Sequence, residues 1–252
     1  MSSSGVAMDT RFEPAAPPNQ RYLSSDSAVG RVDLAGVHGT VAELAAICQA
    51  WGAALAELHT ESTHRSAAPL APRPLILNPQ KLMRSIGRAA KGSGYAAVLE
   101  AYYSPDLRAA AREVDERWTE QHWIHGDLIA TNVLVEQTPA LRVSFAHLED
   151  IGLGDPAWDL ASAVDTIVWL SPRWHVLSQP LVDYLLLGYW RAGGPARLYP
   201  AMQAVRALAT GLRVAGSENE LTGQESVQEE LATWLDRAQG HAARVGRLMA
   251  VA

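Results

Sequence analysis

The sequence predicts a mainly α-helical fold with a small central β-hairpin, which is an α+β class. Apolar residues recur at helical spacing over residues 41–59 and again over residues 227–245, a pattern typical of helices that bury one face. Two β-like segments, 132–136 and 141–149, lie between these helices and are separated by the turn-forming stretch 137–140. We therefore expect a helical body with one hairpin near its middle.

Composition and charge narrow the class of protein. The 252 residues are 48% hydrophobic and 19% charged, which is typical of a globular protein with a sizeable core. A formal net charge of -6 argues against a nucleic-acid binder. The single cysteine, Cys48, falls in a helical apolar pattern and is expected to be a core residue. With no secretory signal and no membrane-length apolar run, we expect a cytoplasmic protein that binds no membrane.

Three segments are expected along the chain. Residues 1–20 are rich in Ser, Ala and Pro and are expected to form a disordered tail. Residues 21–40 carry short apolar pieces and are expected to be a short remnant or linker. Residues 41–252 are expected to form the one folded lobe of the protein.

The first half of this lobe is expected to begin with the helix 41–59. An extended connection follows, because proline lacks the N–H donor and biases the preceding residue away from the helical conformation. The prolines of this connection are Pro69, Pro72, Pro74 and Pro79. Residues 80–121 are expected to form two helices, with breaks around 92–94 and 104–105.

The second half is expected to be helical from Asp155 onward. Asp155 supplies an N-cap and Pro156 suits the first helical position. A further helix is expected to begin at Pro180 and to stop at 193–194, where two glycines stand. The last helix repeats apolar residues on one face, namely Val227, Leu231, Trp234, Ala238, Ala242 and Val245.

A polar stretch stands immediately before the hairpin. Residues 122–132 read HWIHGDLIATN and place His125, Asp127 and Asn132 at fixed offsets. The residues alone leave two interpretations open. They form a functional loop, or they form a sharp turn in which His125 and Asp127 only hydrogen-bond the backbone.

The hairpin bears on this choice. If it turns near residues 138–139, Asn132 lies across the ladder from Phe145, and the alternation of a strand puts His147 and Glu149 on the same face as Phe145. Polar groups gathered at one end of a hairpin suggest a site. The side chains that would converge are Asp127, Asn132, His147 and Glu149.

The order of motifs carries more information than any one of them. His-Gly-Asp-x-x-x-x-Asn is followed by a hairpin, by Gly-Leu-Gly-Asp-Pro-Ala-Trp-Asp-Leu at 152–160 and by Gly-Tyr-Trp-Arg-Ala-Gly-Gly at 188–194. This order closely resembles the aminoglycoside phosphotransferase and choline kinase family, whose members have a protein-kinase-like fold. The resemblance covers roughly residues 41–250 and implies the mostly helical C-terminal lobe of that fold.

The resemblance implies a role for each matched residue. Asp127 matches the catalytic-loop aspartate, which orients the substrate hydroxyl and accepts its proton. Asn132 matches the asparagine that helps to hold Mg²⁺. His125 would brace the catalytic loop. Asp155 and Asp159 match aspartates that are expected to cap a helix and to brace the loop.

Residue 147 is the first departure from the family pattern. The aspartate that normally bridges the metal and the nucleotide phosphates should stand there, and the chain has His147. Imidazole supplies a nitrogen without negative charge and suits Zn²⁺ better than Mg²⁺. Glu149 is a candidate substitute carboxylate. The metal position is therefore assigned to Asn132, Glu149 and His147.

The second departure is an absence. Only 40 residues precede the first long helix, where the family places a β-rich nucleotide-binding lobe. These residues contain no lysine, since the first lysine is Lys81, and Gly30, Gly36 and Gly39 do not form a phosphate loop. The N-terminal nucleotide-binding lobe is therefore expected to be largely absent, and no residue is assigned to the nucleotide.

Three functions stay open at this point. The favoured one is a degenerate, pseudokinase-like protein that acts as a binding or scaffold subunit of a complex, such as a kinase or peptide-modifying assembly. Another protein chain or a second copy would cover the exposed lobe face. The second is an active phosphotransferase that modifies a hydroxyl of a small molecule or of a peptide Ser or Thr, with a partner supplying the N-terminal lobe. Mg²⁺ and ATP are then its cofactors, whereas the degenerate protein needs none.

The third function is a transition-metal site, with which the spacing His-x-x-His-x-Asp is compatible without being specific. Its ligands would be His122, His125, Asp127 and His147.

Four further polar residues are expected to have structural or surface roles. His59 is expected to satisfy carbonyl groups at the end of its helix. Arg197, Arg206 and Arg213 either line a substrate cleft or are solvated, and we favour solvation.

Overall fold

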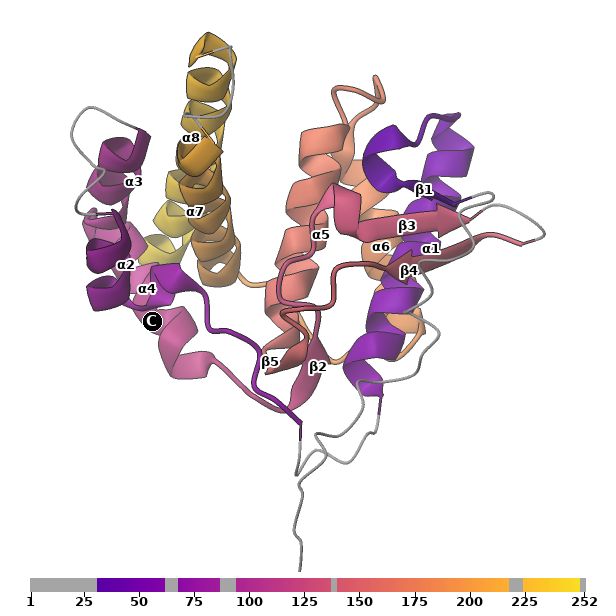
Figure 1. The fold of residues 1–252 in the computed structure, drawn as a ribbon, viewed down its shortest axis with the longest axis horizontal. Coiled ribbons are helices and arrows are strands. Elements are labelled where there is room, and N and C mark those ends of the chain that lie inside the picture. The colour runs from indigo at the N-terminus through magenta and orange to yellow at the C-terminus, as the bar shows by residue number, and fades with distance from the viewer. Residues whose placement is uncertain (1–30, 62–67, 87–93, 137–139, 218–223, 250–252) are drawn as a thin grey trace, which may run out of the picture.

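The computed structural model describes residues 31–61, 68–86, 94–136, 140–217 and 224–249 (Figure 1). The expected tail at 1–20, the first part of the expected linker and the turn residues 137–139 lie outside the described residues.

Helices dominate the described residues, as expected. They are α1 (Val41–Thr60), α2 (Pro79–Ile86), α3 (Gly94–Tyr102), α4 (Pro105–Arg117), α5 (Pro156–Leu170), α6 (Ser178–Arg191), α7 (Pro200–Ser217) and α8 (Gln224–Met249). The strands are β1 (Arg31–Asp33), β2 (His122–Ile124), β3 (Val133–Glu136), β4 (Arg142–Phe145) and β5 (Gly152–Gly154). In Figure 1, α1, α5 and α6 lie in the same half of the molecule as the β1–β3–β4 sheet, and α2, α3, α4, α7 and α8 lie in the other half.

The predicted central hairpin is confirmed as β3–β4. Strand β1 adds to β3, so that the sheet order is β1–β3–β4, and all pairs are antiparallel. The expected linker is described from residue 31 onward, and its residues 31–36 complete this sheet and continue into a 3₁₀ turn, Leu34–Gly36. Strands β2 and β5 form a second, two-stranded sheet, which brings the segments before and after the hairpin together.

The register of the hairpin corrects one expectation. Val133, not Asn132, pairs with Phe145. Asn132 lies one step further, where its backbone carbonyl accepts a hydrogen bond from Ala146 N at 3.0 Å. Beyond the strand His147 adopts a left-handed conformation, with φ 56°. This conformation ends the alternation of the strand, so the shared face predicted for Asn132, His147 and Glu149 was wrong.

The helices α1 and α6 pack at backbone contact. A Cβ added to Gly52 would lie 2.0 Å from the Leu185 carbonyl oxygen, and a Cβ added to Gly188 would lie 2.0 Å from the Gln49 carbonyl oxygen. No side chain larger than hydrogen fits at either position. The two glycines thus set the distance between these helices.

Helix α1 alone among the described helices is long and apolar enough to cross a membrane by length and composition, with a mean hydropathy of 1.3. Half of that window is buried inside the protein. Buried residues of α1 such as Trp51 and Leu55 belong to the core. Its apolar character therefore has an explanation in the packing.

Residues 80–121 hold three helices rather than the two expected. Ser104 caps α4 by accepting a hydrogen bond from Leu107 N, and Pro105 occupies the first turn. The Ser-Pro pair therefore starts a new helix instead of interrupting one.

The helices after Asp155 agree closely with the sequence. Asp155 caps α5 by accepting a hydrogen bond from Ala157 N at 2.9 Å. Helix α6 begins two residues before Pro180, which fits the first turn, and Gly193 has the positive φ of 83° that ends it. All six apolar positions predicted for one face of α8 are buried.

Candidate active site

The HGD loop, residues 125–127, is held by hydrogen bonds to two residues in the first turn of α5, Trp158 and Asp159. Asp159, which is fully buried, accepts hydrogen bonds from His125 N at 2.6 Å and from Gly126 N at 3.0 Å. The indole nitrogen of Trp158 donates to Gly126 O at 2.8 Å. Gly126 has φ 86°, a conformation that glycine adopts without strain. The loop-bracing role predicted for Asp159 is confirmed by these contacts.

His125 uses both ring nitrogens to connect the loop with the end of β4. Its Nδ1 accepts a hydrogen bond from Asp127 N at 3.3 Å. Its Nε2 lies 2.7 Å from Ala146 O and must donate, because a carbonyl oxygen only accepts. The ring is therefore the neutral tautomer with the proton on Nε2. His125 braces the loop, as the sequence predicted.

His59 is a part of this support that the sequence analysis missed. The expectation that it satisfies helix-terminal carbonyls with its side chain was wrong. Its Nε2 lies 3.3 Å from Asp159 Oδ2 and its Nδ1 lies 2.8 Å from Tyr189 Oη. Tyr189 Oη in turn accepts from Ala196 N at 3.1 Å. A buried chain of hydrogen bonds thus links α6 and α1 to the carboxylate that holds the loop.

The electrostatics of Asp159 follow from this chain. Burial by itself raises the pKa of the Asp159 carboxyl, but the hydrogen bond and charge of His59 and the contacts with His125 outweigh it and hold the pKa below its usual value. Asp159 is therefore an ionised carboxylate at neutral pH, which is the strongest acceptor for the two loop N–H groups.

Asp127 and Asn132 are positioned by the loop. Asn132 donates from Nδ2 to Asp127 O at 2.8 Å, and its Oδ1 receives only a long contact of 3.4 Å from Thr131 Oγ1. Within the described residues, no hydrogen bond or ion pair engages the Asp127 carboxylate. This carboxylate is half-buried.

His147 and Glu149 do not lie in an enclosed site. Their side chains are 67% and 77% exposed, and His147 Nδ1 lies 3.8 Å from Glu149 Oε1. Mg²⁺ takes oxygen ligands in a near-octahedral arrangement. Asn132 Oδ1 fits that requirement, whereas an exposed imidazole at residue 147 does not. The described residues contain no group of three or more His, Cys, Asp or Glu placed to hold a metal ion. Of the three residues assigned to the metal, Asn132 thus lies at the HGD loop, whereas His147 and Glu149 lie on the surface.

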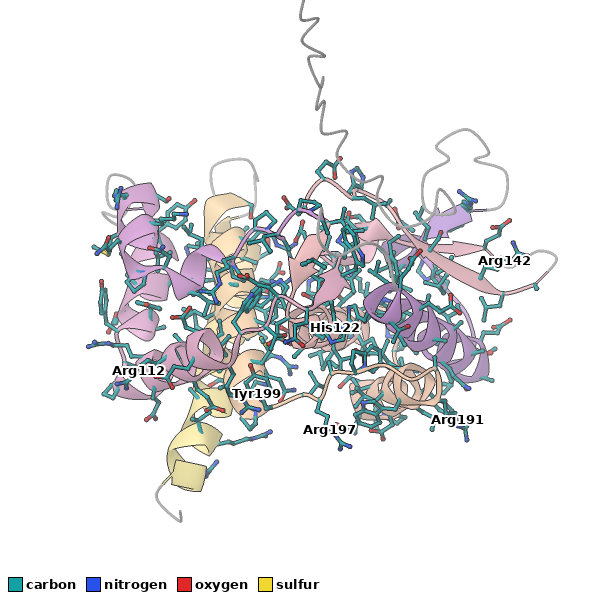
Figure 2. The ribbon with its side chains drawn as sticks, turned by 90° about the horizontal axis from the view of Figure 1, so that it is seen from below. Arg112, His122, Arg142, Arg191, Arg197 and Tyr199 are labelled. Atoms are coloured by element: carbon teal, nitrogen blue, oxygen red, sulfur yellow. The ribbon has the colours of Figure 1, made fainter. Side chains whose placement is uncertain are left out.

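The structure also does not support the transition-metal alternative. His122 Nδ1 bonds to His59 O at 2.9 Å, and both ring nitrogens of His125 are engaged as above. Figure 2 shows His122 on the underside of the molecule, near the connection that carries Arg197 and Tyr199. His122, His125, Asp127 and His147 therefore do not point at one centre.

A cavity of about 310 Å³ adjoins the loop. We call it the α5–α7–α8 cavity, because most of its lining comes from these helices, while Ile129, Ala130 and Thr131 of the loop segment close one end. The side chains that define its chemistry are Ser162, Asp165, Trp169, Arg206, Arg213 and Trp234.

Arg206 was expected to be solvated, and that expectation was wrong. It is only 6% exposed, donates from Nε to Ser162 Oγ, and places its guanidinium 4.9 Å from the Trp158 ring centre. Burial, reinforced by the charge of Arg213, lowers the pKa of Arg206 to about 10, although the charge of Asp127 is among those that oppose the shift. Arg213 lines the same cavity from an exposed position, and Arg197 is exposed, as expected.

Asp165 is a second buried charge that the sequence analysis missed. Its Oδ1 accepts a hydrogen bond from Arg237 Nε at 2.9 Å and lies 2.9 Å from Arg237 Nη2 in an ion pair, while its Oδ2 has no hydrogen-bond partner. Burial raises the pKa of Asp165 and outweighs the opposing charges of Arg237 and Arg206. A sequence signal for this cavity did exist, because Arg206, Thr210 and Arg213 interrupt one face of an otherwise apolar helix.

Comparisons with known proteins agree with this geometry. The family model described as the phosphotransferase enzyme family matches residues 28–208. No curated protein sequence matches the chain significantly.

Similar solved structures include a choline kinase from Streptococcus pneumoniae, with a TM-score of 0.55 at 15% identity over 86% of this chain and 68% of that one. An aminoglycoside-3'-phosphotransferase of type VIII has a TM-score of 0.52 at 18% identity over 71% and 64%. An ethanolamine kinase from Plasmodium vivax has a TM-score of 0.53 at 15% identity over 77% and 60%.

This chain therefore spans between 60 and 68% of the length of these three proteins. At such identities the similarity shows the fold, which is protein-kinase-like. Because the family model covers well over half of the residues, the chain belongs to the phosphotransferase enzyme family.

Proposed function

We propose that this chain is the acceptor-binding and catalytic-loop unit of a phosphotransferase assembly, and that it does not transfer phosphate by itself. One observation carries the proposal. In the part of the chain that the structure describes, no hydrogen bond or ion pair engages the Asp127 carboxylate, which stands on a loop braced by His125 and Asp159 beside a cavity. These features support an acceptor site, whereas residue 147 does not supply the metal carboxylate that the family resemblance implies.

Asp127 would act on the acceptor. It would orient a hydroxyl group and accept the hydroxyl proton as the oxygen attacks the phosphoryl group. Three proteins of this fold are named a choline kinase, an ethanolamine kinase and an aminoglycoside phosphotransferase. By analogy, we propose a hydroxyl of a small molecule as the acceptor.

The nucleotide side is the reason for proposing an assembly. Phosphoryl transfer depends on positioning and on neutralising charge around the phosphates. The chain has two lysines, of which Lys81 is exposed on α2 and Lys91 lies outside the described residues. We propose that a partner chain, a second copy or a further part of the protein supplies the phosphate-binding groups. In this sense the chain alone is pseudokinase-like. The cytoplasmic location expected from the sequence stays a prediction.

A second candidate is a phosphotransferase that works without such help. The orientation of Asn132 favours it, because Nδ2 is committed to Asp127 O and Oδ1 is left to a metal ion. Glu149 is exposed and could add a carboxylate oxygen. In that case Mg²⁺ and ATP would bind to this chain directly.

Calorimetric titration with ATP separates the two candidates. The chain is titrated with ATP in the presence of Mg²⁺ and then of Mn²⁺, beside Asp127→Ala and Asn132→Ala. We expect no metal-dependent heat from the folded chain. Metal-dependent binding of ATP that weakens in Asn132→Ala would refute the need for an assembly and would support the second candidate. Size measurement by sedimentation would then show whether the folded chain is a monomer or carries a second copy.

A further inference from the structure

The α5–α7–α8 cavity contains two arginines that lack carboxylate partners. Arg206 and Arg213 are seven residues apart on α7, so they project from nearly the same face, two turns apart. Neither has a carboxylate oxygen within 4.0 Å among the described residues, and the only hydrogen bond that Arg206 makes with its side chain is to Ser162. A buried charge without a partner is costly. The positive charge of Arg213 also disfavours the charged form of Arg206.

Among the described residues, no carboxylate of the cavity forms an ion pair with Arg206 or Arg213. Asp165 Oδ1 is engaged by Arg237, through a hydrogen bond from Nε and an ion pair with Nη2. Glu230 is positioned next to Trp234, whose Nε1 lies 3.5 Å from Glu230 Oε1. Asp127 acts on Arg206 through its charge alone, without a direct ion pair. Asp165 Oδ2 has no hydrogen-bond partner in the described structure and forms no ion pair with either arginine, so its influence on Arg206 is through charge alone. Within the described part of the chain, the cavity therefore offers two forked cationic donors and no carboxylate in direct contact with them.

The rest of the cavity suits a small organic molecule. Its volume is about 310 Å³, in the range of small-ligand pockets. Trp234 is buried and Trp169 is half-buried, so that two indole rings supply apolar walls. The loop residues that follow Asp127 close one end. A ligand held by the arginines would thus lie beside the catalytic loop.

We propose that this cavity binds an acceptor that carries an oxyanion, either a carboxylate or a phosphate ester, on Arg206 and Arg213, with its hydroxyl group toward the catalytic loop. Arginine presents a planar fork that matches both oxyanions and forms paired, charge-assisted hydrogen bonds with them. The word acceptor rests on the function proposed above. The anion site itself does not, because it follows from the two unpartnered guanidinium groups.

The test measures binding without nucleotide, by ligand-observed NMR and calorimetry on the full chain. The probes are mandelate for a hydroxy carboxylate, glycerol 3-phosphate for a hydroxy phosphate ester, inorganic phosphate for the free anion and choline for a cation. The main variant is Arg213→Gln, because Arg213 is exposed and its replacement leaves the core intact. Arg213→Lys keeps the charge but not the fork. Arg112→Gln, on the outer part of α4, is the matched control (Figure 2).

We expect at least one of the two hydroxy anions to bind and choline not to bind. The affinity should fall by about tenfold or more in Arg213→Gln, fall less in Arg213→Lys, and stay unchanged in Arg112→Gln. Arg206→Gln should weaken binding at least as much, and circular dichroism checks that this buried replacement still folds. Which of the two anions binds more tightly identifies the oxyanion as a carboxylate or a phosphate ester.

Several results would overturn the proposal. They are binding of choline alone, failure of both hydroxy anions to bind at millimolar concentration, or anion binding that Arg213→Gln leaves unchanged. If inorganic phosphate and ATP bind through the arginines but neither hydroxy anion does, the site belongs to the phosphoryl donor and the acceptor assignment is wrong. Because no turnover is measured, a positive result stands even if the chain never transfers phosphate. A negative result likewise leaves the ATP titration to decide the proposed function.

Discussion

Replacing Asp159 with alanine is the sharpest test of how the catalytic loop is held. The Asp159 carboxylate accepts hydrogen bonds from His125 N at 2.6 Å and Gly126 N at 3.0 Å, and a contact of 3.3 Å from His59. Asp159→Ala leaves these donors unpaired in a buried environment. A hydrogen bond to a charged group contributes about 1.5–3 kcal/mol. The two backbone bonds together therefore amount to about 3–6 kcal/mol.

The net cost is smaller, because the variant also avoids the desolvation of a buried carboxylate. We expect Asp159→Ala to lower the free energy of unfolding by about 3–4 kcal/mol. The matched control is Asp155→Ala, four residues earlier, where Asp155 caps α5 by accepting a hydrogen bond from Ala157 N and also accepts one from the backbone of Thr119. A lost N-cap costs about 1 kcal/mol.

Urea unfolding, followed by tryptophan fluorescence, measures both variants, and the slope of each transition shows whether the unfolding stays comparable. Hydrogen exchange over residues 122–132 locates the effect, since amide protection there should fall in Asp159→Ala and persist in Asp155→Ala. If Asp159→Ala costs no more than Asp155→Ala, or leaves the exchange of the loop unchanged, then Asp159 does not hold the loop in the way argued above.

The remaining predictions concern four other features. The pKa of Asp159 is held below its usual value of 3.8 in the folded protein, so the stability that ionised Asp159 contributes is present above that pH and is lost as the pH falls through the folded pKa. The difference in the free energy of unfolding between the wild type and Asp159→Ala should therefore shrink on acidification. A constant difference down to pH 3 would contradict this sign. Gly188→Ala should lower the free energy of unfolding by about 2 kcal/mol or more, measured by thermal or urea unfolding, because the added Cβ would meet the Gln49 backbone. Gly240→Ala on α8, with open space around it, should instead stabilise the protein by up to about 1 kcal/mol. Equal effects of the two variants would refute the close packing of α1 and α6. Burial raises the pKa of the Cys48 thiol to about 12, so a thiol reagent at pH 8 should label Cys48 only after the protein unfolds. Rapid labelling of the native protein would show instead that the thiol is accessible. His147→Asp should increase the affinity for Mn²⁺ several-fold, and adding Asn132→Ala should remove this increase. His175→Asp, at the other described histidine with positive φ, should leave the affinity for Mn²⁺ unchanged. Equal increases from His147→Asp and His175→Asp would mean that residue 147 has no special place near a metal.

Local patterns predicted most of the helical framework. The apolar face of α8, the Asp155 cap of α5 and the glycine that ends α6 each depend on residues close together in the sequence. Helical spacing and capping are local properties, so a single sequence contains them. The error in the helical framework was also local. The Ser-Pro pair at 104–105 starts a helix rather than bending one.

The loop motif was predicted, but its relation to the hairpin was not. The alternation of a strand applies only while the backbone stays extended. His147 leaves the extended region with φ 56°, and the register places Val133 opposite Phe145. Both facts are properties of the paired strands β3 and β4 and of the segment that follows them, where His125 contacts Ala146 O, and not of the local residue pattern. His147 and Glu149 therefore lie exposed on the surface, whereas continued alternation of the strand would have placed them beside Asn132.

The amino-acid sequence by itself determined the fold class and the family, and it predicted Asp127 and Asn132 as site residues, because spacing and motif order carry that information. Tertiary structure decided which charges are buried. His59, Asp159 and Arg206 stand far apart in the chain or on unremarkable helical positions, and only the packing of α1, α5, α6 and α7 turns them into a support for the loop and a cation in a cavity. The energetic role of a charged side chain depends on its solvent exposure and its partners, and both are properties of the folded protein.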